Sequence, residues 1–105
     1  MPEMYFRVRW PDGGIQRCYS PSTVVQDFFE SGTGYPVDDF VDRSRRALTI
    51  AGERVRATYG FACTSAAEQL AQIEATAAAH AASPGATADD RVVVEALTGP
   101  DGSER

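Results

Sequence analysis

The sequence predicts an α+β fold in which a small, mainly antiparallel sheet, built from a β-hairpin and a C-terminal strand, packs against three helices in the order ββαααβ. Residues 5–19 alternate polar and apolar side chains around a turn, residues 20–82 carry helix starts and helical apolar spacing, and residues 91–97 form a valine-rich run. A chain of 105 residues can bury one core but hardly two. We therefore expect a single domain over residues 1–98 and a disordered C-terminal tail over residues 99–105.

The hairpin forms the N-terminal part of the chain. Residues 5–10 alternate in polarity, Pro11–Gly14 supplies turn residues, and residues 15–19 resume the alternation. The apolar face of this ribbon is expected to hold Phe6, Val8 and Trp10. The opposite, basic face is expected to hold Arg7, Arg9 and Arg17. This basic face is either a solvated surface or a contact surface.

Two alternative helix starts follow the hairpin. Ser20 can cap a helix with Pro21 in its first turn, or Thr23 and Gln26 can form a capping box slightly later. The apolar side of this short helix comprises Val24, Val25, Phe28 and Phe29. The helix is expected to end at residues 31–34, where two glycines let the chain reverse.

The most regular pattern, from Tyr35 to Tyr59, predicts an amphipathic helix of about six turns. Its apolar residues, at steps of three and four, include Val37, Phe40, Val41, Leu48, Ala51 and Val55. Acidic residues precede arginines by four positions in the pairs Asp39–Arg43 and Asp42–Arg46, which stabilises a helix. Gly60 is expected to end the helix, with Phe61 folding back as the hydrophobic contact of that ending.

A third helix is expected to start at Thr64 or Ser65, to run to about Ala82, and to be anchored by Leu70 and Ile73. Its alanine-rich second half either packs closely against a neighbour or frays. Residues 91–97 are expected to form the last strand. This strand pairs either with the first hairpin strand of its own chain or with the sheet of a second copy.

Charge and cysteine usage restrict the classes of partner. Ten basic residues, all of them arginine, stand against fifteen acidic ones, and the net charge of −5 repels a nucleic-acid backbone. The N-terminus lacks the pattern of a signal peptide, and no apolar run approaches membrane-spanning length. We therefore expect a cytoplasmic protein with no nucleic-acid or membrane partner, in which Cys18 and Cys63 are free thiols.

No catalytic, metal or cofactor site can be assembled from the reactive residues. A nucleophilic Cys18 or Cys63 would need a nearby base, and the only histidine is His80 in the alanine-rich helix end. One histidine and two separated cysteines do not reach the three or four clustered ligands of a zinc site. No glycine-rich phosphate loop is present. We expect a protein that is not an enzyme and holds no cofactor, with a small cysteine-dependent enzyme as the alternative.

The hairpin and the helix start that follows it are the best candidate contact region. The hydroxyls of Ser20, Ser22 and Thr23 flank the unpaired N–H donors of a helix start, which can either cap that helix or bind a small anion. The candidate binding residues are Arg7, Arg9, Trp10, Arg17, Cys18, Tyr19, Ser20, Ser22 and Thr23.

Four stretches give the chain a family resemblance. They are residues 6–13, 18–22, 47–56 and 59–66, and the similarity spans roughly Tyr5 to Glu74. The chain resembles a family of small bacterial proteins named for the nitrogen-starvation response and encoded in gene clusters beside a nitrilase, a radical-SAM protein, an acetyltransferase and a flavin oxidoreductase. The resemblance implies a setting of nitrogen limitation and nitrile-type nitrogen assimilation, and carries over no catalytic residues.

The expected function is therefore that of a non-enzymatic accessory or regulatory protein that acts by protein–protein association. The expected partner is a second copy of the chain or an enzyme encoded in the same cluster. The alternatives are the cysteine-dependent enzyme and a sensor that binds a small anion at residues 20–23.

Overall fold

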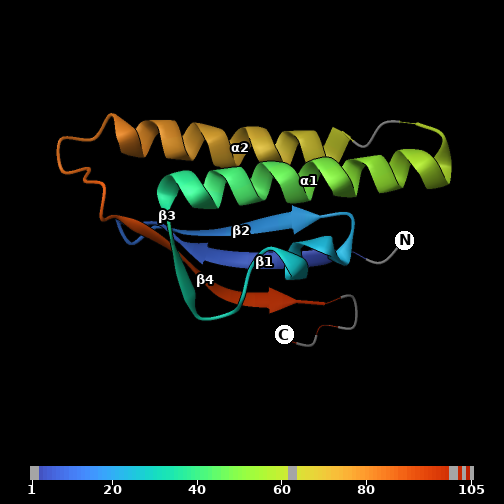
Figure 1. Ribbon diagram of the computed structural model, residues 1–105, viewed down its shortest axis with the longest axis horizontal. Helices are drawn as coiled ribbons and strands as arrows, with labels where there is room; N and C mark the ends of the chain where they lie inside the picture. The colour runs from blue at the N-terminus through green and yellow to red at the C-terminus, as the bar shows by residue number, and fades with distance from the viewer. Residues whose placement is uncertain (1–2, 62–63, 100–101, 103, 105) are drawn as a thin grey trace.

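The computed structural model describes residues 3–61, 64–99, 102 and 104. The molecule has two layers, with both α-helices lying over one face of a four-stranded sheet (Figure 1). Along the chain the elements are β1 (Met4–Arg9), β2 (Ile15–Ser20), the 3₁₀ helix η1 (Thr23–Asp27), β3 (Thr33–Pro36), α1 (Val37–Tyr59), α2 (Thr64–Ala81) and β4 (Arg91–Thr98). The predicted α+β class is confirmed.

The strand order is β2-β1-β4-β3, and every neighbouring pair is antiparallel. The hairpin of β1 and β2 forms as predicted, with Tyr5 opposite Tyr19 and Arg7 opposite Arg17. β4 pairs with β1 of its own chain, which settles the alternative left open for the last strand. A bulge interrupts this pairing after Arg7.

The prediction of a three-stranded sheet is wrong, because the segment expected to be only a reversal forms β3 at the edge of the sheet. Gly32, with a φ of 81°, does turn the chain, but Thr33–Pro36 then pairs with the first half of β4. A four-residue strand containing a glycine and a proline has no readable alternation, and proline is tolerated only at such an edge. Pairing with β4, rather than local propensity, makes this segment a strand.

The prediction of three helices in the order ββαααβ is also wrong. The first expected helix is a short 3₁₀ helix, and its N-cap is Ser22, whose side chain accepts a hydrogen bond from the N–H of Val24. The β-branched pair Val24 and Val25 disfavours a longer helix, and the chain must turn back at Gly32 to place β3. The expected apolar side chains still reach the core, since Val24, Val25 and Phe29 are buried.

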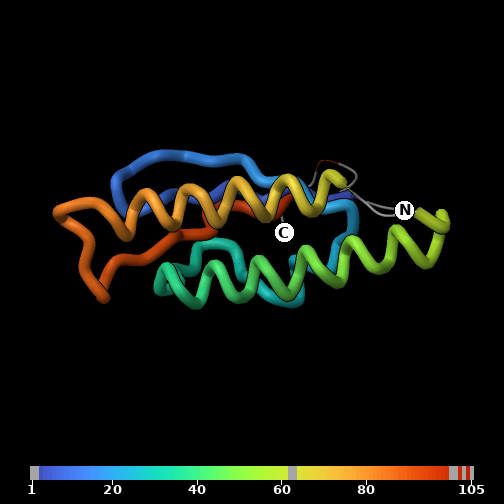
Figure 2. The backbone as a smooth tube through the Cα atoms, turned by 90° about the horizontal axis from the view of Figure 1, so that it is seen from above, coloured from blue at the N-terminus to red at the C-terminus, as the bar shows by residue number. Residues whose placement is uncertain are grey.

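The two long helices form, but α1 begins at Val37 rather than Tyr35, because Tyr35 and Pro36 belong to β3. Phe61, expected to fold back as the hydrophobic contact of the helix ending, is instead 64% exposed. In α1, the ion pairs Asp39–Arg43 and Asp42–Arg46 both have N–O distances of 2.8 Å. Gly60 ends α1 with a φ of 78° and donates its N–H to the carbonyl of Arg56. Seen from above, α2 runs on the β2 side of the sheet and α1 on the η1 and β3 side (Figure 2). Neither helix, over its described length, has the apolar character needed to span a bilayer.

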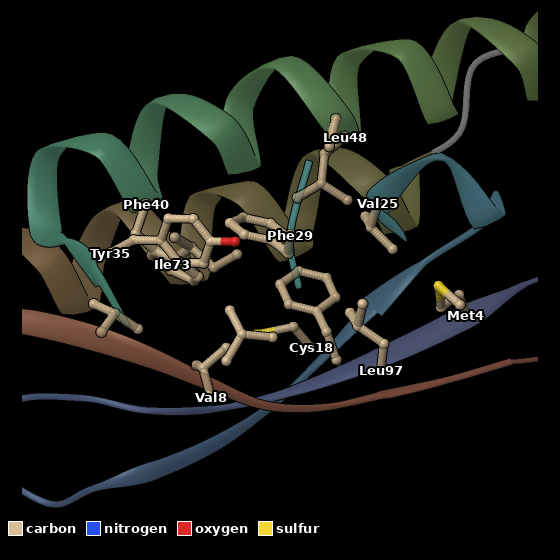
Figure 3. Packing of buried hydrophobic residues seen from close by; sticks show 14 of the residues in the cluster. Met4, Val8, Cys18, Val25, Phe29, Tyr35, Phe40, Leu48, Ile73 and Leu97 are labelled. Atoms are coloured by element: carbon tan, nitrogen blue, oxygen red, sulfur yellow. The ribbon is translucent and has the colours of Figure 1, made fainter. Parts of the chain in front are cut away.

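The core lies between the layers and is centred on aromatic side chains. Phe29 contacts Phe6, Tyr35 and Phe40, with ring centroids 5.3–5.7 Å apart. Ile73 anchors α2 in this cluster and is fully buried (Figure 3). The side chains of Val8 and Cys18 enter the same cluster from β1 and β2. One face of the hairpin is therefore buried in the core, and an exposed site on the hairpin must lie on its other face.

Candidate functional site

The sheet separates the candidate binding residues into two groups. Successive side chains of a strand point to opposite faces. Arg7 and Arg9 of β1 and Arg17 of β2 point away from the helices, as predicted, and are exposed. The buried residues Trp10, Cys18 and Ser20 belong to the covered side. The predicted residues therefore do not form one site.

Cys18 and Trp10 are core residues. Cys18 is 0% exposed, and its burial raises the pKa of the thiol to about 12. Trp10 packs edge-on against Phe40 and donates its Nε1–H to Oε1 of Gln16 over 2.8 Å. A thiol that stays protonated inside the core is a poor nucleophile. Cys63, the other candidate nucleophile, lies outside the described residues.

The hydroxyls expected to surround an anion cap the chain instead. Ser20 Oγ donates to the carbonyl of Ser22 over 2.6 Å. Ser22 Oγ accepts from the N–H of Val24 over 3.3 Å and from Nη1 of Arg54 over 3.0 Å. Both serines are buried, and Thr23 is half-buried at the start of η1. The local hydroxyl groups of Ser20 and Ser22 are thus occupied by protein partners.

The uncovered face of the sheet gathers the remaining candidates into what we call the arginine–tyrosine face. It comprises Tyr5, Arg7, Arg9, Arg17, Tyr19 and Glu95. The rings of Tyr5 and Tyr19 meet edge to face with centroids 5.4 Å apart. The guanidinium of Arg17 lies 4.0 Å from the centroid of the Tyr5 ring, a cation–π contact. These contacts favour a position of the exposed Arg17 side chain over the Tyr5 ring.

Glu95 ties the two arginines of β1 together. Its carboxylate lies 3.3 Å from Nε of Arg7 and 2.9 Å from Nε of Arg9. The bulge in the β1–β4 pairing leaves Glu95 between the residues opposite Arg7 and Val8, which directs its side chain at both guanidinium groups. The hydrogen bond from Arg9 is the largest effect that lowers the pKa of Glu95. The positive charge of Arg9 and the hydrogen bond and charge of Arg7 lower it further. With three arginines against one carboxylate, the face remains basic in a chain of net charge −5.

Two members of this face were not among the predicted site residues. Tyr5 had a readable signal, because it lies two positions before Arg7 in an alternating strand and so shares its face. Glu95 had none, because its place depends on the long-range pairing of β4 with β1 and on the bulge.

A second cluster, also missed, joins the end of α2 to the start of β4. Nε2 of His80 lies 2.8 Å from Oδ2 of Asp90, and Asp90 also accepts from the N–H and the hydroxyl of Thr87. The backbone hydrogen bond from Thr87 is the largest of the effects that lower the pKa of Asp90. His80 is therefore not a simply solvated helix end, since it holds the connection to β4 in place. No group of three potential metal ligands occurs anywhere in the described part of the chain.

The fold and the site define a class of protein: a small two-layer α+β domain whose sheet is covered by helices on one face and carries arginine and tyrosine side chains on the other. The chain belongs to the family of nitrogen starvation-induced protein NitG, whose family model matches residues 5–97. The match confirms the nitrogen-starvation resemblance, and it includes the whole arginine–tyrosine face and both helices. No curated protein and no solved structure matches the chain.

Proposed function

We propose that this protein is a non-enzymatic accessory protein of the nitrogen-starvation response that acts by binding an acidic surface of another protein through the arginine–tyrosine face. The observation that carries the proposal is the arrangement of this face, where Arg17 lies over the Tyr5 ring and Glu95 pairs with both Arg7 and Arg9. Pre-ordered arginine and tyrosine side chains lose little conformational entropy on binding and are enriched among the residues that contribute most to interfaces.

The charge of the face selects an acidic partner. The side chains of Arg7 and Arg9 are each 51% exposed, whereas Glu95 is 22% exposed, so the positive groups are the more accessible ones. Arg17 stands directly opposite Arg7 without an intervening carboxylate, an arrangement that is destabilising in an isolated sheet. A carboxylate supplied by a partner would relieve this repulsion.

A protein partner fits the face better than a single-stranded nucleic acid does. Stacking platforms present free aromatic ring faces to the bases. Here Tyr5 and Tyr19 pack against each other, and the Arg17 guanidinium already covers the Tyr5 ring. The net charge of −5 adds a long-range repulsion against phosphate groups.

The proposed setting is the cytoplasm of a nitrogen-starved cell, and the proposed process is nitrile-type nitrogen assimilation. The family supports the nitrogen-starvation part of this setting. The resemblance that implies a nitrilase gene cluster suggests an enzyme of that cluster as the partner. A second copy of the chain is the other partner that the sequence leaves open.

Charge reversal on the face tests the proposal. The tagged chain and its Arg17→Glu variant are used to capture partners from nitrogen-starved cells, and the affinity of each captured cluster enzyme is then measured. Arg17→Glu should keep the fold, because it places a carboxylate opposite Arg7. It should weaken binding by at least about tenfold, because it sets like charges against each other across the interface.

A matched control separates this effect from a general change of charge. Arg45 on α1 has a side chain that is 50% exposed and is also in an ion pair, 3.0 Å from Glu74. Arg45→Glu should change the affinity less than about twofold. Recovery of no cluster protein would contradict the proposal. So would equal weakening by both variants, or tighter binding of the face to a single-stranded oligonucleotide than to any captured protein.

A further inference from the structure

The C-terminal end of α1 exposes two aromatic side chains. Tyr59 is 50% and Phe61 64% exposed, and their ring centroids are 6.0 Å apart. This end of the helix extends beyond the ends of the strands, so the sheet does not back it (Figure 1). Clustered exposed aromatics are uncommon on a surface that meets only water, and they mark contact sites.

An apolar groove lies on the same helix, between α1 and α2. It is open to solvent, has a volume of about 270 Å³, and is lined mainly by Leu48, Gly52, Ala66 and Leu70. A Cβ atom added at Gly52 would meet only the Cβ of Ala66, at an ordinary 3.8 Å. The fold has room for alanine at this position but uses glycine, the weakest helix former after proline. The absence of a side chain here keeps the groove open.

Opposite charges flank the groove on α1. Glu53 and Arg56 both line it and are both exposed. Neither forms an ion pair with another residue in the part of the chain that the structure describes. The groove therefore combines an apolar floor with one acidic and one basic group in accessible positions.

We propose that two copies of this chain associate through α1 in an antiparallel, two-fold contact, with Phe61 of each copy seated in the α1–α2 groove of the other. One helix register accounts for both charges and for Phe61. When Glu53 lies against Arg56 of the second copy, Arg56 lies against Glu53 of that copy, as two-fold symmetry requires. The same register brings Phe61 to the level of Leu48 of the second copy, which is at the groove.

This self-complementarity selects a second copy as the occupant. The groove, both charges and the aromatic end follow one another along α1 and past its C-terminus, and they span about 20 Å along the helix axis. Another protein would have to present the same features in the same antiparallel order. Joining two helical pairs in this way gives a four-helix layer with the sheets outside, a packing that antiparallel helices commonly adopt.

The mass in solution, measured by sedimentation equilibrium from about 1 µM to about 1 mM chain, tests the association. The chain should approach twice its mass of 11.3 kDa. Phe61→Ala should raise the dimer dissociation constant at least about tenfold, because it removes the aromatic anchor from the groove. Ile15→Ala is the matched control, because Ile15 is likewise a large exposed apolar residue, 50% exposed, but lies on the sheet, and its replacement should leave the constant unchanged.

A charge exchange tests the register. Glu53→Arg and Arg56→Glu should each weaken the dimer by placing like charges opposite each other. An equimolar mixture of the two variants should restore it, because both contacts of the mixed dimer then join opposite charges. A chain that is monomeric up to 1 mM overturns the proposal, and so does a dimer indifferent to Phe61→Ala or one that the mixture does not restore.

Groove filling gives a second measure of the same contact. Gly52→Leu should abolish the dimer by occupying the groove, while Gly52→Ala, which adds only a methyl group, should reduce it much less. Arg17→Glu, on the sheet face, should leave the mass unchanged, so failure of this inference can be told apart from failure of the proposed function. A dimer that persists in Gly52→Leu would contradict the seating of Phe61 in the groove.

Discussion

Glu95 is the residue whose carboxylate positions the arginines of β1 on the arginine–tyrosine face. It contacts Arg7 and Arg9 together, from a position created by the bulge in β4. Without it, three guanidinium groups would share one side of the hairpin with no negative group among them. The order of the face therefore depends on Glu95 being ionised.

Stability should carry the pH signature of this carboxylate. Its pKa in the folded chain is lowered from the ordinary value of 4.5, chiefly by the hydrogen bond from Arg9. A lowered pKa contributes stability that is present above the ordinary value and is lost as the pH falls through the folded-state value. Glu95→Gln should therefore be less stable than the natural chain at pH 7, and the gap should narrow below about pH 4.5. Urea unfolding at pH 7 and below about pH 4.5 measures the difference in unfolding free energy between the two chains. A difference that does not change with pH would contradict this prediction.

Cys18 should be chemically silent in the folded chain. Its thiol is fully buried and its pKa is raised to about 12. In a Cys63→Ser background, a thiol reagent at pH 8 should react with no thiol until the chain is unfolded, and then with one. Fast labelling of the folded chain would revive the cysteine-dependent enzyme as an alternative. Cys18→Ser should also destabilise the fold by about 1–3 kcal/mol, because it buries an unpaired hydroxyl.

At the scale of elements, two glycines, one inside α1 and one at its C-terminal cap, should respond oppositely to replacement by alanine. Gly60 has a φ of 78°, so Gly60→Ala should lower the unfolding free energy by about 1 kcal/mol. Gly52 is in the helix interior with room for a methyl group, so Gly52→Ala should raise it by up to about 1 kcal/mol. Urea unfolding at a low concentration, where any dimer dissociates, measures both. Changes of the same sign would contradict either the left-handed conformation of Gly60 or the free space beside Gly52.

The elements whose signals are local could be predicted from the sequence. The hairpin follows from alternation around Pro11–Gly14, and α1 from its spacing, its ion pairs and Gly60. β3 and η1 could not be predicted, because their conformations are set by pairing with β4 and by packing under α1. The prediction that Arg7 and Arg9 share one face is confirmed for the same local reason, since alternation alone puts both side chains on one side of the strand.

The remaining contacts of the candidate site could not be predicted from the sequence, because they depend on how distant segments pack together. Glu95 is 88 positions from Arg7 and 86 from Arg9 in the sequence. Their contact depends on a bulge that no local sequence pattern predicts. His80 and Asp90 are close in sequence, but their contact depends on where the connection after α2 turns. Ser20 and Ser22 have the residue types of an anion site, and only the structure reveals that capping occupies their hydroxyls.

At the scale of the whole molecule, the two proposed contact surfaces belong to different layers. The arginine–tyrosine face is on the uncovered side of the sheet, and the α1–α2 groove is between the two helices. Figure 1 shows these two layers. A dimer formed through the helices would leave both sheet faces accessible. Such a dimer could bind two sites of an oligomeric enzyme at once, which raises the apparent affinity without any new contact.

The charge distribution of the molecule predicts the salt dependence of binding. Three of the ten arginines lie on the face, so the rest of the surface is more acidic than the net charge of −5 suggests. Binding of an acidic partner through the face should weaken as the ionic strength rises, because the interacting charges are exposed. Arg17→Glu should flatten this dependence, whereas Arg45→Glu should not, and titrations at 50 and about 500 mM salt compare the two. An affinity independent of salt would point to an apolar contact instead.

Nuclear magnetic resonance shows directly whether the arginine–tyrosine face makes the proposed contact. The isotope-labelled chain is titrated with the enzyme captured from nitrogen-starved cells while the arginine side-chain Nε–H signals are followed. We expect the signals of Arg7, Arg9 and Arg17 to shift and to saturate together, and those of Arg45 and Arg56 to stay unmoved. Shifts confined to arginines of α1, or no shift of any arginine at a saturating concentration of that enzyme, would contradict this contact.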